Sequence, residues 1–460
     1  MSAEVDQACT AARTAFVERA LHSSDVRVGL LNAIADQLEA AQSDIVAAAD
    51  AETHLGEARL NGEMARTCAQ LRSFASLIEE GSWVDARIDT EPGLRRMLFP
   101  LGPVAVFGAS NFPLAFSVPG GDTASALAAG CPVVVKAHPA HPQTSALCAA
   151  AISNAVAAAG LPEGVFALVS GGIEVGEALV DHPEITAVGF TGSLRAGRAL
   201  FDRAAARPVP IPVYGELGSV NPVFVCPEAA ASRGPEIAVQ LAGSISLGVG
   251  QFCTSPGVIL GLDERAADTL QADLAERAPA PMLTDGIAAA FVDGAEARTG
   301  MTLDPGQPAA VRVSATRLAA EDTLWEELFG PIAVVAGGAD RQVMLDAARS
   351  LDGQLTASIF ADPGDHALVD ELTSILIDKV GRIILNDVPT GVAVTPAMHH
   401  GGPYPAATSA LHTSVGTAAI ERFAKPVCFQ GFDGTTLPDE LQDANPRGIM
   451  RQVDGVLTRD

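Results

Sequence analysis

The sequence predicts an α/β fold with more than one domain, and three observations support this. From residue 103 onward, short apolar runs alternate with alanine-rich segments of helical length, which is typical of βαβ units and a parallel sheet. Most of these runs end in Gly, Ser, Thr, Asn or Lys, at the strand ends where such sheets bind ligands. The chain has 460 residues, more than a single hydrophobic core usually organises.

The amino-terminal part is predicted to be helical. Leu31, Ile34 and Leu38 recur at intervals of three and four, which is the period of an amphipathic helix, and the same spacing returns later in this part. We therefore expect helices across residues 4–80 and assign them a scaffolding role, because they carry no residues with obvious chemistry.

The elements after residue 82 follow from the same patterns. Residues 82–100 break the helical period and are expected to form a short hairpin around the Glu91-Pro92-Gly93 turn. The expected strands are then 104–107, 132–136, 165–169, 187–190, 222–225, 258–260, 331–335, 358–360 and 382–385, with helices over 122–129, 143–159 and 173–181. After Arg422 we expect irregular chain.

Composition and charge exclude several classes of protein. With 48% hydrophobic and 18% charged residues, the chain can bury large cores and is not disordered. Its net charge of −26 argues against nucleic acid or an anionic membrane as a partner. It leaves open a local basic pocket, which an anionic cofactor requires.

The cysteines and the amino terminus indicate a reducing compartment. The seven cysteines are scattered with no Cys-x-x-Cys pair, so we expect neither a disulfide framework nor a metal site. The amino terminus lacks the pattern of a secretion signal, and no apolar run reaches the length of a membrane span. We therefore expect a cytoplasmic protein.

The stretch Gly248–Pro256 holds the most informative thiol. Cys253 follows two glycines and precedes Thr254, Ser255 and a proline, so a regular strand is unlikely there. A thiol on such a turn is a candidate nucleophile. The alternative is a small buried hydrophobe, the usual state of a free cysteine.

Two features suit an anionic cofactor. The segment 189–197 (GFTGSLRAG) follows a strand and opens a helix, whose free N–H groups and dipole favour a phosphate; an ordinary glycine-rich turn is the alternative. Lys136 closes a three-valine strand, where it either meets an adenosine ribose or phosphate or faces solvent. No acid follows at 138–140, and a carboxylate there would repel a 2′-phosphate, which favours NADP.

Other polar residues sit where chemistry is plausible. Asn111 follows a strand and can donate to an oxyanion, or can simply form a turn. Glu216 lies among glycines and apolar residues, a setting that can raise a carboxyl pKa and suit a base, although a solvated loop acid is commoner. Glu326 and Glu327 adjoin an aromatic, apolar turn. The adjacent histidines at 399–400 lack further ligand spacing and are expected to be structural rather than metal-binding.

Taken in order, these pieces make the chain similar to the aldehyde dehydrogenase superfamily. The matching stretches are SNFP (110–113), VVVK (133–136), GFTGS (189–193), ELGSVNP (216–222), GQFC (250–253), EELFGP (326–331) and SVGT (414–417). Wider wording, such as GASNFPLAFS and PTGVAVTPAMHHGGPYPAAT, resembles the 2-oxoglutarate-semialdehyde (2,5-dioxopentanoate) dehydrogenases and the related NADP-dependent enzymes.

The resemblance implies a role for each matching residue. Cys253 is the nucleophile, Asn111 with the Cys253 backbone N–H forms the oxyanion hole, and Glu216 is the base for the hydrolytic water. The implied cofactor residues are Lys136 at the adenosine ribose, Gly192 and Ser193 near the pyrophosphate, Thr191 at the nicotinamide, and Glu327 and Phe329 at its ribose. The residues expected beside the substrate are Phe112, Phe252, Thr254 and Ser255.

The resemblance also implies an architecture. It predicts a Rossmann-like dinucleotide-binding domain (1–82 and 101–217), an α/β catalytic domain (218–412), and oligomerisation segments with a carboxyl-terminal tail (83–100 and 413–460). A homodimer or homotetramer is expected. The implied cofactor is NADP or NAD, with NADP slightly favoured, although Glu174 and the absence of a basic residue in GGIEVG (171–176) weaken that preference.

The implied reaction is oxidation of an aldehyde to an acid through a cysteine thioester, with 2-oxoglutarate semialdehyde as the preferred substrate. A broad or fatty aldehyde dehydrogenase using NADP is the alternative within the family. Outside it, a cysteine acyltransferase or esterase would use Cys253 and Glu216 without nicotinamide. A silent scaffold is disfavoured, because it has no chemical need for Cys253, Asn111 and Glu216 together.

Overall fold

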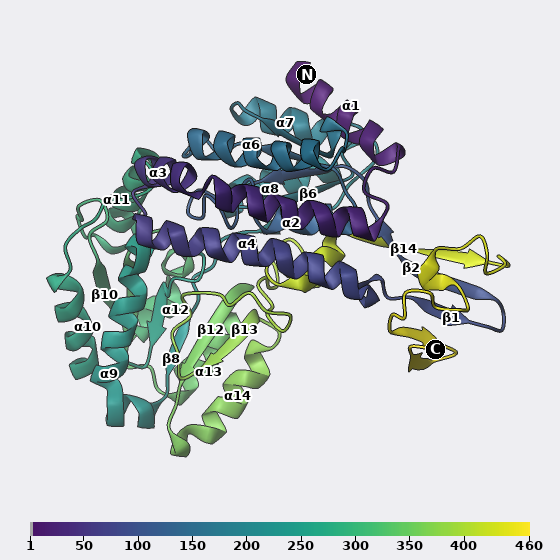
Figure 1. Ribbon diagram of the computed structural model, residues 1–460. Helices are drawn as coiled ribbons and strands as arrows, with labels where there is room; N and C mark the ends of the chain where they lie inside the picture. Colours follow the sequence, from purple (N-terminus) through teal and green to yellow (C-terminus); the bar gives the residue numbers. More distant parts are fainter. Residues whose placement is uncertain (1–2) are drawn as a thin grey trace.

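A computed structural model describes residues 3–460 (Figure 1). The amino-terminal region is helical, as predicted, and consists of α1 (Ala3–Val17), α2 (Ser24–Ala40), α3 (Gln42–Thr53) and α4 (Glu57–Glu80). The strands that follow form three sheets. The described chain also contains the short 3₁₀ helices η1 (Ser82–Val84), η2 (Glu163–Val165), η3 (Leu247–Gly250), η4 (Asp322–Trp325), η5 (Pro363–Asp365), η6 (Thr417–Phe423) and η7 (Asp439–Leu441).

The first sheet is parallel and has the strand order β5-β4-β3-β6-β7. Its strands are β3 (Val104–Phe107), β4 (Val133–Lys136), β5 (Phe166–Val169), β6 (Ala187–Thr191) and β7 (Val213–Glu216), and its connecting helices are α5 (Gly121–Ala129), α6 (Pro142–Ala158), α7 (Ile173–Asp181) and α8 (Leu194–Ala205). Because side chains alternate along a strand, Val104 and Val106 pack toward α2, α4, α5 and α6, while Ala105 and Phe107 pack toward α1 and α7.

Register brings the polar strand ends of this sheet to one edge. Phe107 pairs with Lys136 on one side and with Phe190 on the other, and Thr191 pairs with Glu216. The carboxyl ends of β3, β4, β6 and β7 therefore lie level, at the edge where parallel sheets bind ligands. The α/β class predicted from the alternating pattern is confirmed.

The second sheet is also parallel, with the order β10-β11-β9-β8-β12-β13. It comprises β8 (Val223–Val225), β9 (Val258–Leu260), β10 (Ala309–Ser314), β11 (Ile332–Gly337), β12 (Gln354–Phe360) and β13 (Val380–Leu385). Helices α9 (Pro227–Ser246) and α10 (Glu264–Glu276) cover one face, and α11 (Asp285–Thr299), α12 (Ala315–Ala320), α13 (Arg341–Ser350) and α14 (His366–Leu376) cover the other.

The third sheet, β14-β2-β1-β15-β16, projects from the rest of the molecule (Figure 1). It joins the predicted hairpin of β1 (Arg87–Asp89) and β2 (Leu94–Pro100) to β14 (Ala424–Gln430), β15 (Arg451–Val453) and β16 (Val456–Thr458). The expectation of irregular chain after Arg422 was wrong. β14 is ordered by antiparallel pairing with β2 along its whole length, and its half-exposed residues give little apolar alternation. The domain boundaries and the oligomeric state stay predictions.

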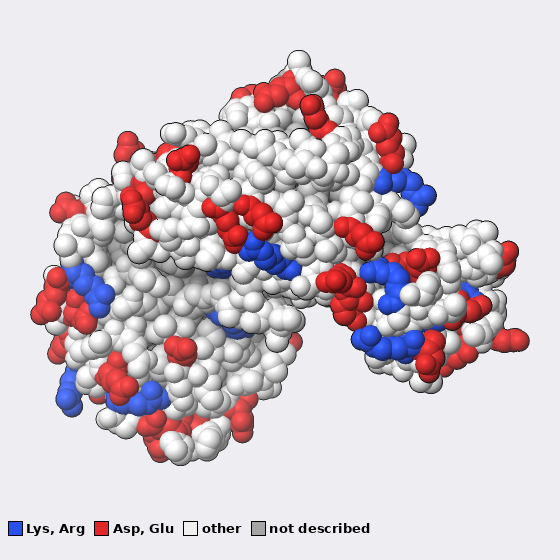
Figure 2. Space-filling model, viewed as in Figure 1, with Lys and Arg blue, Asp and Glu red and all other residues white. Residues whose placement is uncertain are grey.

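Surface charge agrees with the composition. On the face in Figure 2, acidic side chains outnumber basic ones and are spread over the surface. Among residues 3–460, no helix is long and apolar enough to cross a bilayer.

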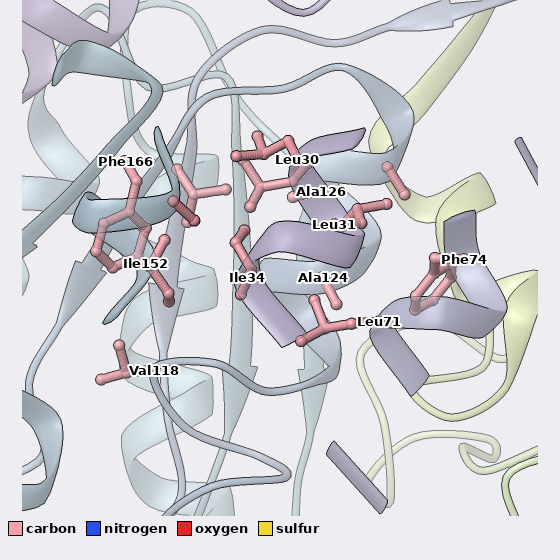
Figure 3. Packing of buried hydrophobic residues seen from close by; sticks show 14 of the residues in the cluster. Leu30, Leu31, Ile34, Leu71, Phe74, Val118, Ala124, Ala126, Ile152 and Phe166 are labelled. Atoms are coloured by element: carbon pink, nitrogen blue, oxygen red, sulfur yellow. The ribbon is translucent and has the colours of Figure 1, made fainter. Parts of the chain in front are cut away.

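The core beneath α4 is tightly packed and includes Phe74, Leu71, Ile34 and Leu31 (Figure 3). Phe74 is fully buried. We expect Phe74→Ala to lower the free energy of unfolding by about 3–5 kcal/mol, because the cavity left behind cannot fully close. Chemical denaturation measures this, with Val209→Ala, at a 71% exposed residue, as the control; equal effects of the two changes would contradict the prediction.

Candidate active site

Cys253 lies on a turn with unusual backbone geometry. Three consecutive residues, Gly248, Val249 and Gly250, adopt positive φ angles of 56°, 59° and 63°. This conformation is strained for the β-branched Val249. A Cβ on Gly250 would lie 2.3 Å from the carbonyl carbon of Gly330, so that position requires glycine for space as well. The turn is therefore held by close packing against the backbone at Gly330 and by side-chain contacts.

One of those contacts comes from Asn221. Its buried side-chain amide donates to the carbonyl oxygens of Cys253 and Ser255, each at 2.9 Å. The amide oxygen in turn accepts hydrogen bonds from Ser219 and Thr356. Asn221 thus fixes the backbone that carries the thiol.

The thiol faces a histidine and a carboxylate. Cys253 Sγ lies 3.4 Å from His400 Nε2, and the same nitrogen lies 2.9 Å from Glu216 Oε1. The expectation of a structural histidine pair is corrected at position 400, where the ring belongs to this cluster. Sulfur, nitrogen and carboxylate donors within 4.8 Å of one another could also hold a metal ion, so the expected absence of a metal stays a prediction.

The loop after β13 positions the histidine. His400 N–H donates to Thr413 Oγ1 at 2.8 Å, and its carbonyl oxygen accepts from the backbone N–H of Ser414 at 2.8 Å. The Ser414 hydroxyl donates to Glu216 Oε2 at 2.6 Å, so both carboxylate oxygens are engaged. Glu216 ends β7 and is buried, as is His400.

The pKa values of the thiol and of the carboxyl group are shifted in opposite directions. Burial, and next the negative charge of Glu216, raise the pKa of Cys253 well above its usual value. Burial also acts to raise the pKa of Glu216, but the charge and hydrogen bond of His400, together with the Ser414 hydroxyl, hold that pKa below its usual range. The expectation of a raised Glu216 pKa was wrong, because these two donors come from distant sequence.

Asn111 is buried in the loop after β3. Its Nδ2 donates to the backbone carbonyl oxygen of Gln251 at 3.0 Å, and its backbone carbonyl oxygen accepts from Arg59 Nη2 at 2.7 Å. An amide nitrogen carries two hydrogens, so one N–H stays available beside the thiol-bearing turn. Asn111 and Cys253 line the same cavity.

That cavity has a volume of about 980 Å³ and runs along the carboxyl edge of the first sheet. Every residue assigned to the cofactor or to catalysis lines it: Asn111, Lys136, Thr191, Gly192, Ser193, Glu216, Cys253, Glu327 and Phe329. Its volume is at the upper end of the range for small-molecule sites, which suits a ligand as large as a dinucleotide.

The cavity wall has the groups that a dinucleotide needs. Ser193 caps α8 by accepting from the Ala196 N–H at 3.3 Å. The first N–H groups of that helix form the positive end of its dipole. Lys136 is half-buried; burial lowers its pKa, and the charge of Glu174 opposes that effect. Burial raises the pKa of Glu327 to about 8, which favours a protonated carboxyl near neutral pH.

The four residues expected beside the substrate do not share one environment. Phe112 and Phe252 pack edge to face, with ring centroids 5.4 Å apart. Thr254 is buried and its hydroxyl accepts from the Gly391 N–H, so it supports the turn. The Ser255 hydroxyl oxygen is buried without a partner among the described residues.

The motifs did not indicate a role for His400 or Asn221 at the site. His400 lies 184 residues from Glu216 in sequence, and adjacent histidines carry no spacing that indicates a catalytic pair. Asn221 lies inside the ELGSVNP stretch, and its φ of 46° explains why a residue tolerant of that region stands there.

Comparison with known proteins agrees with this geometry. A family model described as "Aldehyde dehydrogenase family" matches residues 1–295. Alpha-ketoglutaric semialdehyde dehydrogenase 2 of Azospirillum brasilense is 45% identical over 98% of this chain and 91% of its own length. Alpha-ketoglutaric semialdehyde dehydrogenase of Acinetobacter baylyi is 43% identical over 99% and 92%.

Solved structures share the fold at lower identity. Glyceraldehyde-3-phosphate dehydrogenase GapN of Methanocaldococcus jannaschii, complexed with NADP, superposes with a TM-score of 0.76 at 20% identity, covering 93% of each chain. Proline utilization A of Bdellovibrio bacteriovorus gives a TM-score of 0.78 at 22% identity, over 92% of this chain and 46% of that one. On the family model and the two curated relatives, this chain is an oxidoreductase acting on aldehydes and belongs to the aldehyde dehydrogenase family.

Proposed function

We propose that the chain oxidises 2-oxoglutarate semialdehyde to 2-oxoglutarate, with NAD(P) as the oxidant. The observation that supports the chemistry best is the contact series from Cys253 Sγ through His400 Nε2 to Glu216 Oε1, beside a cavity of dinucleotide size. The substrate is proposed from the two relatives named for it, which match nearly the whole chain.

Attack on the aldehyde requires a thiolate, and Glu216 is placed to produce it. Because the pKa of Cys253 is raised, the resting group is a thiol at neutral pH. His400 Nε2 carries the hydrogen that it donates to Glu216 Oε1, so the ring orients the carboxylate and does not itself accept the thiol proton. A Glu216 oxygen lies within 4.8 Å of the sulfur; transfer of the thiol proton to it gives the thiolate, and the proton passes on to solvent before the last step.

Addition of the thiolate to the carbonyl carbon places negative charge on the aldehyde oxygen. The free N–H of the Asn111 amide, with the backbone N–H of Cys253, is proposed to stabilise that charge. The backbone of Asn111 is held by Arg59 and its side chain by Gln251, so the donor is oriented before substrate arrives. This saves the cost of ordering it during the reaction.

Lys136, the α8 end at Thr191–Ser193, Glu327 and Phe329 are proposed to hold the cofactor. A nicotinamide cofactor held by these residues would supply the acceptor for the substrate hydride, and the oxidised carbon would then be a thioester on Cys253. Glu216 then takes a proton from water, and the hydroxide attacks the thioester and releases the acid.

Two features act oppositely on cofactor choice. No carboxylate follows Lys136 at positions 138–140, which suits a 2′-phosphate. The Glu174 carboxylate acts on the same Lys136 amine and opposes that phosphate. We therefore propose that both cofactors are used, with a modest preference for NADP.

A substrate panel tests the proposal. Each of 2-oxoglutarate semialdehyde, succinate semialdehyde, hexanal and decanal is offered with NAD and with NADP, and cofactor reduction is followed by absorbance. We expect 2-oxoglutarate semialdehyde to give the highest kcat/KM, by about tenfold or more. A higher value for decanal would make the enzyme a fatty aldehyde dehydrogenase instead.

A further inference from the structure

Two arginines of α4 lie against an aromatic wall next to the thiol, formed by the rings of Phe112, Phe116 and Phe252. Arg59 and Arg66 are seven residues apart and so share one face of the helix. Arg59 Cζ lies 4.7 Å from the ring centroid of Phe252 and 5.0 Å from that of Phe112. Arg66 Cζ lies 5.1 Å from the centroid of Phe116 and 5.7 Å from that of Phe112.

This wall adjoins the reaction centre. Phe252 immediately precedes Cys253, and the ring of Phe116 lies 6.4 Å from that of His400. The positive charge of Arg66 acts on the Cys253 thiol, where it opposes the effects of burial and of Glu216. The ring of Phe116 thus packs against Arg66 and lies near His400, the neighbour of the thiol.

The hydrogen-bonding capacity of Arg66 is unused. Within the described part of the chain it makes no hydrogen bond and no ion pair, and its Nε and Nη2 are buried without a partner. Stacking on phenylalanine engages the face of a guanidinium and leaves the N–H groups at its edge free. A half-buried cation without acceptors is unfavourable, so this arrangement is costly unless a ligand supplies them.

Nearby carboxylates do not supply those acceptors. Glu63 lies on the same helix between the two arginines, but its Oε1 accepts the backbone N–H groups of Leu114 and Ala115 instead. Glu63 Oε2 has no hydrogen-bond partner among the described residues, and the negative charges of Glu63, Cys253 and Glu216 act on Arg66 without forming a hydrogen bond or ion pair with it. In a chain of net charge −26 with an acidic surface (Figure 2), a local cation is what an anionic substrate needs to bind.

We propose that Arg66 is the specificity-determining residue that binds the carboxylate of an anionic aldehyde. This inference rests on the proposed function and deepens it. The planar guanidinium can donate two parallel hydrogen bonds to a carboxylate, and Phe112 and Phe116 hold it in place for that purpose. A neutral aliphatic aldehyde would gain nothing from this contact, so Arg66 selects for charge.

Arg59 has a different task. Its Nη2 is already committed to the carbonyl oxygen of Asn111 at 2.7 Å, so it is a positioning residue for the oxyanion donor. Loss of Arg59 should therefore slow anionic and neutral aldehydes alike. Loss of Arg66 should slow the oxidation of anionic aldehydes far more than that of neutral ones.

The test measures a ratio on Arg66→Met. Succinate semialdehyde is paired with butanal, and 2-oxoglutarate semialdehyde with pentanal, so that each pair matches in chain length. We expect the ratio of kcat/KM, carboxylated over neutral, to fall about 30-fold, chiefly through KM, because a charged hydrogen bond is lost. Arg66→Lys should keep part of the ratio. Both aldehydes of a pair are measured on one preparation, so partial unfolding cancels.

A binding measurement complements the kinetics. Calorimetric titration of the purified enzyme with 2-oxoglutarate should give a dissociation constant that Arg66→Met weakens by a similar factor. Arg72→Met is the matched control, because Arg72 lies on the same helix but is exposed and pairs with Glu39 and Asp36. This control should change neither the ratio nor the binding.

The outcomes separate the two proposals. A wild-type enzyme that prefers a different carboxylated aldehyde would overturn the proposed substrate, while the Arg66 proposal stands if Arg66→Met removes the preference. An unchanged ratio in Arg66→Met, or equal losses for both members of each pair, would overturn the Arg66 proposal and leave the proposed reaction intact.

Discussion

Replacing Cys253 with alanine is expected to lower kcat for aldehyde oxidation by about 10⁴-fold or more, because the covalent step has no substitute thiol. Five of the other cysteines are buried, and the sixth, Cys428, is exposed on β14. Burial raises the pKa of the buried thiols, as it does to about 12 for Cys226. None of the six lines the cavity. Steady-state assays with 2-oxoglutarate semialdehyde measure the loss.

The fold and the cofactor site should survive this change. Alanine removes one sulfur from a turn that Asn221 holds through backbone carbonyls, so those hydrogen bonds are kept. NADPH binding, followed by fluorescence, should stay within about twofold of wild type. Cys428→Ala is the matched control and should keep full activity. Retained turnover in Cys253→Ala would contradict the assignment of the nucleophile.

His400→Gln is expected to lower kcat/KM by about 10²–10⁴-fold at neutral pH, because the ring that orients Glu216, the proton acceptor for the thiol, is lost. The loss should shrink as pH rises. With its pKa raised, Cys253 is mostly thiol at neutral pH, and the fraction present as thiolate grows about tenfold per pH unit below that pKa. The variant should therefore gain activity with pH more steeply than the wild type.

Profiles of kcat/KM from pH 6 to pH 10 check this prediction. The control is His399→Gln, which changes the adjacent ring, for which the described structure shows no contact with Cys253 or Glu216. Parallel profiles for His400→Gln and wild type would mean that His400 does not assist removal of the thiol proton. A loss of equal size in His399→Gln would point to a disturbed loop rather than to a lost contact with Glu216.

The sequence could predict the first sheet and much of its edge because both depend on local pattern. Apolar runs ending at Phe107, Lys136 and Thr191 predict buried parallel strands, and parallel pairing places the residues after them together. Of the third sheet, the sequence predicted the hairpin of β1 and β2 but not β14. β14 has weak alternation and owes its order to β2, more than 300 residues earlier in the chain.

The cluster around the thiol was harder to predict for the same reason. Asn111, Glu216 and Cys253 were found because each lies in a matching motif. His400 lies in a long loop with little periodicity, and neither the matching stretch around it nor the adjacent His399 indicates its partners. The proposed role of Arg66 is likewise not indicated by any motif, because the amphipathic pattern of α4 predicts only a scaffold helix.

The hydrogen bonds of Glu216 have a consequence for handling the protein. Residues 387–416 contain no helix or paired strand beyond one isolated bridge, yet they supply both groups that hold the carboxylate at the end of β7. The site is therefore intact only while this segment is ordered. Resistance of residues 387–416 to a protease then reports on competence for catalysis, and cleavage there should silence the enzyme while both large sheets persist.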